Sequence, residues 1–167
     1  MIFASDLAWG VGKKDTKNGF PWKSIPEDFD HFIKETMAIG EMVAGAETAR
    51  AILKYRNGEP LPGRKMYVLS TTLKAPLHPD IPVFDSIKKI DDYMEGKDYI
   101  IIGGAKTYKA YAPLADKIIR SVIHSIYPAD CHFDPYILMD FKMVSEKTIR
   151  EQSEAKPKVT VEYYERK

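Results

Sequence analysis

Two apolar runs that lead directly from a strand pattern into a helix pattern constrain the fold of this chain most strongly. The run "DYIIIGG" (98–104) is apolar throughout its centre and rich in β-branched residues, and the helical pattern "AKTYKAYAPLA" (105–115) follows it. The run "EMVAG" (41–45) leads in the same way into "AETARAILKY" (46–55). Continuous apolar strands are typical of a sheet covered on both faces, and strand–helix units in succession predict a parallel sheet.

The remaining segments extend this alternation and then replace it with strands alone. Further strands are expected at 1–8 and 65–70, and further helices at 25–37 and 86–94. Three strand-like runs without an intervening helix complete the chain, at 117–127, 141–149 and 158–166. We therefore expect one α/β domain over residues 1–167. Its central, mostly parallel sheet has about eight strands, with an antiparallel C-terminal end and about four flanking helices.

Composition narrows the classes of partner and compartment. The formal net charge of +1 gives no reason to expect a nucleic acid or an anionic membrane as partner. Cys131 is the single cysteine, so no internal disulfide can form and a cytoplasmic location is expected. The sequence opens without a signal-peptide pattern and has no apolar run that could span a bilayer. Its four histidines lack metal-ligand spacing, so no metal site is expected.

Two adjacent carboxylates, Glu27 and Asp28, stand at the start of the first predicted helix. Ser24 and Glu27 fit the S-x-x-E pattern of a capping box, so Glu27 is expected to cap this helix. Asp28 shares a helix face with the apolar residues Ile25 and Phe32. Asp28 either complements the positive end of the helix or meets a hydrogen-bond-donating ligand in a partly dry pocket, and the local sequence leaves both interpretations open.

The two strand–helix junctions, "MVAGAET" and "IIIGGAKT", each place glycine and then a hydroxyl residue at a helix start. Such a start allows the backbone to approach a phosphate, although neither junction has the G-x-G-x-x-G pattern of a Rossmann fold. Lys106 lies in the first turn of its helix, where a bound anion would offset an unfavourable interaction with the helix dipole. Arg64, after "LPG", has the planar fork that suits a carboxylate. In the alternative interpretation, Lys106 and Arg64 simply extend into water.

Taken together and in order, these stretches resemble the dihydrofolate reductase family. The matching segments cover almost the whole chain: "GVG", "FPWKSIPEDFDHFIKET", "MVAGAET", "LPGRKMYVLSTT", "YIIIGGAKTYKAYAPLADKI" and "SVIHSIYPADCHF". The resemblance implies reduction of 7,8-dihydrofolate to 5,6,7,8-tetrahydrofolate with NADPH as the hydride source. It also implies a monomer that binds antifolate inhibitors.

The resemblance assigns four residues to catalysis. Asp28 falls on the family's active-site carboxylate, which holds the amino-pyrimidine edge of the pterin with two parallel hydrogen bonds and promotes protonation of N5. Trp22 would hold an ordered water near Asp28. Ser121 stands where the family has a threonine whose hydroxyl bonds this carboxylate, and Tyr108 would border the nicotinamide. Under this interpretation Glu27 caps and Asp28 catalyses.

The resemblance also assigns binding residues around these four. Substrate-binding residues are expected to be Ala4, Phe20, Phe32, Ile52, Leu61, Arg64 and Ile102. Cofactor-binding residues are expected to be Ser5, Val11, Gly12, Gly45, Ala46, Thr48, Leu69, Ser70, Thr71, Gly103, Gly104, Ala105, Lys106 and Thr107. Arg64 would pair with the α-carboxylate of the substrate's glutamate, and the loop from Gly12 to Phe20 would close over the site.

Ala46 and Glu47 depart from the family pattern, because many members carry basic residues at these positions that reach the cofactor phosphates. Loss of a charge-assisted hydrogen bond to a phosphate costs about 1.5–3 kcal/mol. A preference for NADPH over NADH would then depend on Thr71, Thr72 or Lys74. The segments "KKDTKNG" and "KYRNGE" are longer than the pattern, which can alter loop closure and turnover.

Two other functions remain open at this point. A pyrimidine reductase of riboflavin synthesis shares the fold and the cofactor, but it lacks the pair formed here by Trp22 and Asp28. A folate- or nucleotide-binding protein that has lost turnover would keep the fold, and a fold alone does not decide function.

Overall fold

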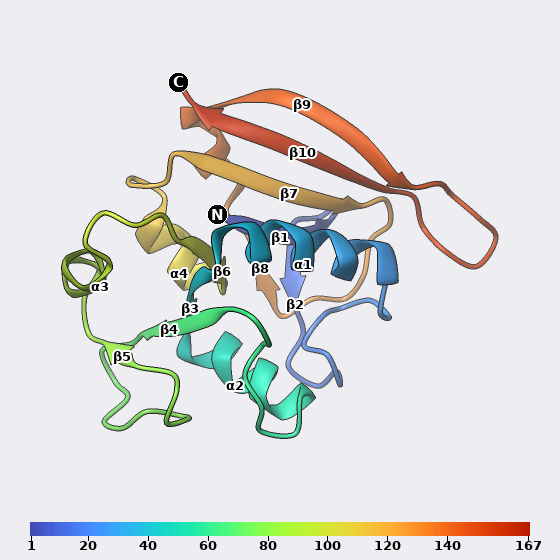
Figure 1. Ribbon diagram of the computed structural model, residues 1–167. Helices are drawn as coiled ribbons and strands as arrows, with labels where there is room; N and C mark the ends of the chain where they lie inside the picture. Colours follow the sequence, from blue (N-terminus) through green and yellow to red (C-terminus); the bar gives the residue numbers. More distant parts are fainter.

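Strands and helices alternate along the chain until an antiparallel C-terminal hairpin ends it, in the computed structural model of residues 1–167 (Figure 1). The strands are β1 (Ile2–Asp6), β2 (Gly10–Gly12), β3 (Glu41–Gly45), β4 (Lys65–Leu69), β5 (Val83–Phe84), β6 (Ile100–Gly103), β7 (Lys117–Ile123), β8 (Cys131–His132), β9 (Phe141–Arg150) and β10 (Val159–Arg166). The helices are α1 (Pro26–Ile39), α2 (Ala46–Tyr55), α3 (Ile87–Met94) and α4 (Ala105–Tyr111), with a 3₁₀ helix η1 (Pro135–Asp140) before β9.

The eight main strands form two hydrogen-bonded sheets that lie edge to edge. One has the order β5-β4-β3-β6 and is parallel throughout, and the other has the order β1-β7-β10-β9. Strand β1 pairs with β7 in parallel, whereas β10 is antiparallel to both of its neighbours. Strand β6 packs beside β1, so the two sheets follow one another across the molecule (Figure 1). The predicted α/β class, the antiparallel end and the four helices are confirmed, although hydrogen bonding divides the expected single sheet into two.

Successive residues of the central strands point to opposite sides, and both sides are buried. Met42 and Ala44 of β3 contribute to one hydrophobic cluster, and Val43 between them contributes to the other. Helices α1 and α2 cover the first side through residues such as Phe32 and Leu53. Helices α3 and α4 cover the second side. This double burial is why the strand sequences lack polar alternation.

The start of α1 differs from the expected capping box. Ile25 is the N-cap residue and no side chain caps the helix, so the capping assignment of Ser24 and Glu27 was wrong. Glu27 instead forms an ion pair with Arg150 of β9, at 3.4 Å between Oε2 and Nη1. An arginine more than a hundred residues away in the sequence thus replaces the local cap. The helix directs Glu27 and Asp28 to different neighbours.

Strands β2, β5 and β8 were not expected from the sequence. Each has only two or three residues, which is too short for a periodic pattern to be recognised. Strands β2 and β8 pair with each other, and β2 packs beside β1, where the Gly10 amide donates to the Asp6 carboxylate at the end of β1. None of the helices is long and apolar enough to cross a membrane.

Candidate active site

Helix α1 places Asp28 between two hydrophobic clusters. Ile25, one turn earlier, packs in a small cluster with Ala4 and Trp22, and Phe32, one turn later, packs against the core side covered by α2. Asp28 therefore stands on the apolar face of α1, as its spacing predicts. It retains some exposed surface, but burial of its carboxyl group raises its pKa above the usual range. A carboxyl group in such surroundings is suited to carrying a proton.

Strand β7 places Ser121 next to that carboxyl group. Ser121 is 3% exposed and pairs across the sheet with Ala4 of β1. Its hydroxyl lies close enough to the Asp28 carboxylate to favour the charged form, and so it partly offsets the rise in the pKa of Asp28. The structure thus places Asp28, Ser121 and Ala4, which were all expected at the site, in one region.

Aromatic rings form the wall beside Asp28. Trp22 is 5% exposed and stacks with Phe20, at 5.5 Å between ring centroids. Tyr127 packs on Trp22 at 5.9 Å, and Phe29 meets Phe20 edge to face at 6.2 Å. The rings of Phe20, Tyr127 and Phe29 of α1 thus hold the Pro21–Trp22 segment in place.

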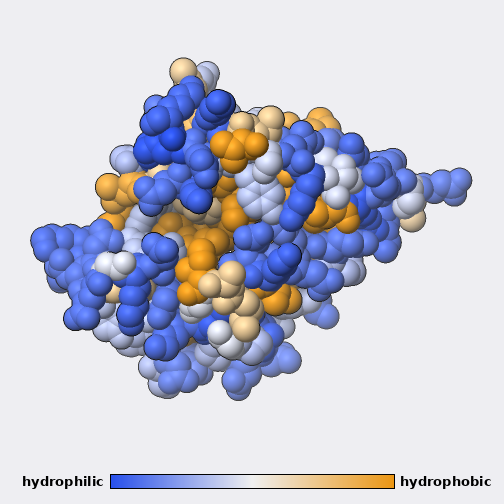
Figure 2. Space-filling view, turned by 45° about the horizontal axis from the view of Figure 1, so that its top comes forward, coloured by the Kyte–Doolittle hydropathy of each residue, from blue (hydrophilic) through white to orange (hydrophobic).

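Four apolar residues from α1, α2, β6 and the segment between α2 and β4 pack against one another, and the region that they border beside Asp28 is called the slot below. Phe32, Ile52 and Leu61 are partly buried against the cluster that contains Ile102. Figure 2 shows hydrophobic surface gathered in a hollow on one face of the molecule, between hydrophilic rims. The four residues were expected to contact substrate, and the structure gathers them on the same side of the core as Asp28.

Arg64 lies at the end of this slot and is held in place by polar contacts. Its Nη1 donates to Thr36 Oγ1 at 2.8 Å, and its Nε donates to the Pro62 carbonyl at 3.1 Å. The guanidinium carbon lies 6.0 Å from the centroid of the Phe32 ring. Arg64 is half-buried, and burial lowers its pKa, with the nearby charge of Arg56 adding to the effect. It has no carboxylate partner in the protein, which leaves it available to an anionic ligand.

Sequence reasoning missed two residues near Arg64, of which Thr36 holds its side chain and Arg56 adds a like charge. Thr36 is completely buried, and its hydroxyl donates to the Phe32 carbonyl at 2.7 Å while it accepts from Arg64. Arg56 donates from Nε to the Pro60 carbonyl at 3.0 Å, two residues from the carbonyl that holds Arg64. A threonine in the middle of an otherwise good helix was the available signal for Thr36, since such residues often bond the backbone one turn earlier. Arg56 gave no comparable signal.

The two glycine junctions meet at the ends of β3 and β6. A Cβ atom on Gly45 would lie 2.5 Å from Thr107 Oγ1, and one on Gly103 would lie 3.1 Å from Thr48 Oγ1. Each glycine thus faces the hydroxyl residue that begins the other helix. The peptide bond between Gly103 and Gly104 is cis. The backbone can approach a ligand closely here, as a dinucleotide phosphate requires, so these residues fit the expected cofactor.

Tyr108 extends from α4 toward the same strand ends. It is 4% exposed and its hydroxyl donates to the Ile2 carbonyl at 2.9 Å. Burial raises the pKa of Tyr108 far above its usual value, so the phenol stays neutral at any physiological pH. A Cβ on Gly103 would lie 3.2 Å from this hydroxyl, which places Tyr108 beside the glycine cradle.

The other expected cofactor residues differ in their accessibility. Val11 and Gly12 are half-buried on β2, whereas Ser5 is completely buried and its hydroxyl accepts from Arg120 at 2.8 Å. The Ser5 side chain therefore faces away from the slot, and the structure does not bring it to a ligand. Ser70 accepts from the backbone amide of Leu73 at 3.1 Å.

A cavity of about 280 Å³ lies beyond the end of β4, where Leu69, Ser70 and Thr71 follow one another. Its lining includes Ser70, Leu73 and Lys74, together with Phe84 and Asp85. Thr71 and Thr72 are exposed next to it. On the opposite side of the junction, Ala46 and Ala105 are half-buried, Lys106 is exposed, and Glu47 is ion-paired with Arg50. Glu47 thus has a cationic partner within its own helix.

Comparison with known proteins identifies the family of the chain. The sequence profile of the dihydrofolate reductase family matches residues 1–166. The chain is 27% identical over 141 residues to the dihydrofolate reductase of Ureaplasma parvum, covering 84% of this chain and 82% of that protein. It is 26% identical over 146 residues to the dihydrofolate reductase of Staphylococcus aureus, covering 87% and 83%.

The same relationship is found in three dimensions. The fold is similar to that of dihydrofolate reductase from Enterococcus faecalis complexed with NADP(H) and RAB-propyl, with a TM-score of 0.81 and 24% identity over 99% of this chain and 94% of that one. A profile match over nearly every residue is far more specific than a shared fold. The chain therefore belongs to the dihydrofolate reductase family, whose members reduce 7,8-dihydrofolate to 5,6,7,8-tetrahydrofolate with NADPH.

Proposed function

We propose that Asp28, Trp22, Ser121 and Tyr108 form the catalytic site of this reductase. NADPH, when bound, supplies the hydride that C6 of the substrate receives. The observation that carries the proposal is Asp28, a carboxyl group set in apolar surroundings with a raised pKa and one hydroxyl partner. The raised pKa keeps more of the carboxyl protonated near neutral pH, and this allows it to promote protonation of N5.

The neighbours of Asp28 orient the pterin. The two carboxylate oxygens can accept parallel hydrogen bonds from the amino-pyrimidine edge, while the Ser121 hydroxyl keeps the carboxylate in one orientation. The Trp22–Phe20 stack walls off this region and would hold the water that relays the proton. The neutral Tyr108 hydroxyl is anchored on the Ile2 carbonyl, and its oxygen would steady positive charge on a nicotinamide held beside it.

Replacing Ser121 with alanine removes the group that lowers the pKa of Asp28, so this pKa is expected to rise further. The pH at which kcat/KM falls to half of its maximum should then move to higher pH. Loss of the orienting hydrogen bond should also lower the maximum about two- to tenfold. A pH–rate profile checks both, with Ser121→Thr as the control that keeps the hydroxyl. An unchanged midpoint in Ser121→Ala would separate Ser121 from the proton-donating step.

The Arg64 side of the slot is proposed to bind the acidic tail of dihydrofolate. Thr36 and the Pro62 carbonyl fix the orientation of Arg64, leaving its remaining N–H groups for a carboxylate. Arg56 on the same turn adds a second positive charge. The apolar residues between this end and Asp28 would enclose the aromatic part of the substrate.

Replacing Arg64 with glutamine is expected to raise KM for dihydrofolate about 10- to 100-fold and to leave kcat within about twofold, because charge-assisted hydrogen bonds to the tail are lost while Asp28 is untouched. Steady-state kinetics with dihydrofolate and with dihydropteroate, which lacks the glutamate, measure the effect. The dihydropteroate KM should not change. The matched control is Arg50→Gln, since Arg50 is exposed and paired with Glu47. Equal losses with both substrates would contradict the assignment.

The cofactor is proposed to lie across the glycine cradle, with its phosphates at the starts of α2 and α4. These starts offer unpaired backbone N–H groups, and the absence of side chains on Gly45, Gly103 and Gly104 allows close approach. Two lysines line the cavity described above: Lys89 is paired with Asp85, whereas Lys74 has no carboxylate partner in the protein. We propose that Lys74 with Thr71 and Thr72 supplies the contact that favours NADPH over NADH.

The assay that tests the proposal follows absorbance at the nicotinamide band with dihydrofolate present, for NADPH and NADH under matched conditions. Dihydrofolate-dependent oxidation of NADPH is the expected result, and the NADH rate measures the preference. Folded protein that oxidises neither cofactor would instead be a binding protein that has lost turnover.

We further propose that the enzyme acts as a cytoplasmic monomer and that compounds with an amino-pyrimidine edge compete with dihydrofolate at Asp28.

A further inference from the structure

Arg120, in the middle of β7, is a buried cation on the sheet face opposite Asp28. Successive residues of a strand point to opposite faces, so Ser121 faces Asp28 and Arg120 faces away. Arg120 is 6% exposed, and its Nε donates to Ser5 Oγ at 2.8 Å. Its Nη1 donates to the Glu162 carboxylate of β10 at 3.2 Å. Nothing in the catalytic proposal uses this cation.

The guanidinium of Arg120 also holds the connection between β1 and β2. Its carbon lies 3.5 Å from the centroid of the Trp9 ring, a close cation–π contact. The Trp9 carbonyl accepts from the Phe133 amide at 2.9 Å, and the Asp6 carboxylate accepts from the Gly10 amide at 2.8 Å. Trp9 has a positive φ of 65°, which few non-glycine residues adopt. The backbone that leads into β2 is therefore fixed by the contacts of Trp9 and by the hydrogen bond of Gly10.

A series of aromatic contacts extends from Trp9 to the catalytic region. The Trp9 and Phe133 rings stack at 6.2 Å between centroids, and Phe133 meets Tyr108 edge to face at 5.8 Å. Val11 of β2 packs against the same cluster. One buried cation is thus connected both to β2 and to the Tyr108 ring.

We propose that Arg120 is a positioning residue for NADPH: by holding Trp9, it fixes β2 and the Tyr108 ring where the nicotinamide binds. The inference rests on the proposed function, which places Val11, Gly12 and Tyr108 at the cofactor. Arg120 touches none of the substrate residues, since Asp28, Phe32 and Arg64 lie on the other side of the sheet. Its loss therefore affects cofactor binding selectively.

The test uses the double variant Arg120→Met/Glu162→Gln, which removes both charges together. Replacing a buried ion pair as a unit generally preserves folding, whereas removal of one partner leaves an unpaired buried charge. The Kd for NADPH, measured by calorimetry, is expected to rise at least fivefold. The KM for dihydrofolate at saturating NADPH should stay within twofold, as should the midpoint of the pH–rate profile. The variant Trp9→Leu keeps the ion pair and is expected to give the same selective loss.

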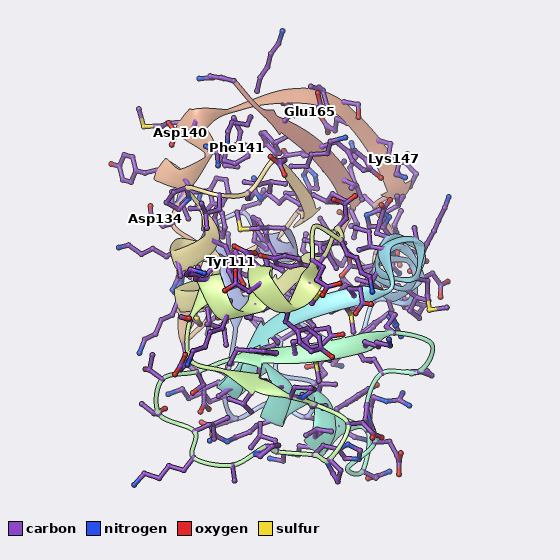
Figure 3. All side chains as sticks on the ribbon, turned by 60° about the vertical axis from the view of Figure 1, so that its left-hand side comes forward. Tyr111, Asp134, Asp140, Phe141, Lys147 and Glu165 are labelled. Atoms are coloured by element: carbon purple, nitrogen blue, oxygen red, sulfur yellow. The ribbon has the colours of Figure 1, made fainter.

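Arg166→Met is the matched control. Arg166 also lies over an aromatic ring, 4.6 Å from the centroid of Phe141, and it donates to the carbonyls of Ala115 and Ala112. Arg166 pairs with Phe141 at the open end of the hairpin, whereas Glu162, the partner of Arg120, pairs with Glu146 near the middle. Figure 3 labels Phe141, at the start of β9, and Lys147, farther along the same strand. This control loses the same kind of stacked cation, so it should be destabilised while its Kd for NADPH stays within twofold of the wild type.

Three results would overturn the inference: an unchanged NADPH Kd in both folded Arg120 and Trp9 variants, an equal loss for NADPH and dihydrofolate, or the same NADPH loss in Arg166→Met. Arg120→Lys adds a further check, because lysine keeps the charge but lacks the planar group that stacks on Trp9. It is expected to show the NADPH loss, and full recovery would contradict a role for the stack. If the proposed cofactor site itself is wrong, Gly45→Ala should leave the NADPH affinity unchanged. This result distinguishes a wrong cofactor site from a wrong assignment of Arg120.

Discussion

Asp28→Asn is expected to lower kcat for dihydrofolate about 10²- to 10⁴-fold near neutral pH, the range that a general acid contributes. Asparagine occupies the same space and can still contact the pterin edge, but it cannot carry the proton that N5 needs. Binding of NADPH should change little, because the glycine cradle lies on other elements. Single-turnover hydride transfer and calorimetric NADPH binding measure the two effects. Turnover within tenfold of the wild type would mean that the acid has been misassigned.

The same substitution is expected to stabilise the fold at pH 7. Burial raises the folded-state pKa of Asp28, so the folded protein binds this proton more tightly than the unfolded chain does. The contribution of Asp28 to stability is therefore most favourable below its ordinary pKa, declines as pH rises through the raised pKa, and is least favourable at neutral pH. Asparagine removes this dependence, because it has no charge to desolvate.

Thermal unfolding of Asp28→Asn across pH checks this sign. Its Tm should exceed that of the wild type at pH 7, and the difference should shrink as pH falls toward the ordinary pKa of aspartate. Asp30→Asn is the control, since Asp30 lies on the same helix but is exposed. It should alter neither turnover nor this pH dependence. A lower Tm for Asp28→Asn at pH 7 would show that favourable interactions of the charged carboxylate outweigh the cost of its burial.

The sequence predicted the parts of the fold that depend on local pattern. The continuous apolar run at 98–104 implied a strand buried on both faces, and Ile100, Ile101 and Ile102 indeed alternate between two clusters. The glycine that ends such a strand marked each junction where a helix begins. The spacing of Asp28 and Phe32 placed a carboxyl group on the apolar side of α1. Each of these inferences needs only neighbours within a few residues.

The parts that could not be predicted depend on contacts between distant residues. Glu27 fits a capping box, but Arg150 pairs with it from β9 and the cap does not form. Ser5 lies next to Ala4 in the sequence, but the pleat of β1 turns its hydroxyl to Arg120 on the opposite face. The support of Arg64 by Thr36 likewise depends on how α1 meets the turn before β4. Local sequence patterns carry no information on these pairings.

Gly45→Ala is expected to weaken NADPH binding at least tenfold, or about 1.4 kcal/mol, and to lower the free energy of unfolding by about 1–3 kcal/mol. Gly45 has φ −75° and ψ 164°, which any residue can adopt, so conformational freedom is not the reason for glycine here. Space is the reason, because the new Cβ would lie 2.5 Å from Thr107 Oγ1. Relief of this contact requires the buried Thr107 side chain to leave its rotamer or the starts of α2 and α4 to separate, and the cofactor phosphates are proposed to bind at these starts. Calorimetric titration with NADPH and urea unfolding give the two quantities.

The loss of NADPH affinity can arise from crowding between the helix starts or from the new methyl group occupying the phosphate site. The double variant Gly45→Ala/Thr107→Ala distinguishes these two causes, and Thr107→Ala alone is its reference. Removing Oγ1 leaves Gly103 O and Gly104 N, each 3.7 Å from the new Cβ, as its nearest neighbours, which is ordinary contact. If crowding between the helix starts is the cause, stability and NADPH affinity should both return to the values of Thr107→Ala. If stability returns but affinity does not, the methyl group itself occupies space that the phosphates need, and the cofactor lies directly against Gly45. Wild-type affinity in the single Gly45→Ala variant would contradict both explanations and place the cofactor phosphates away from this junction.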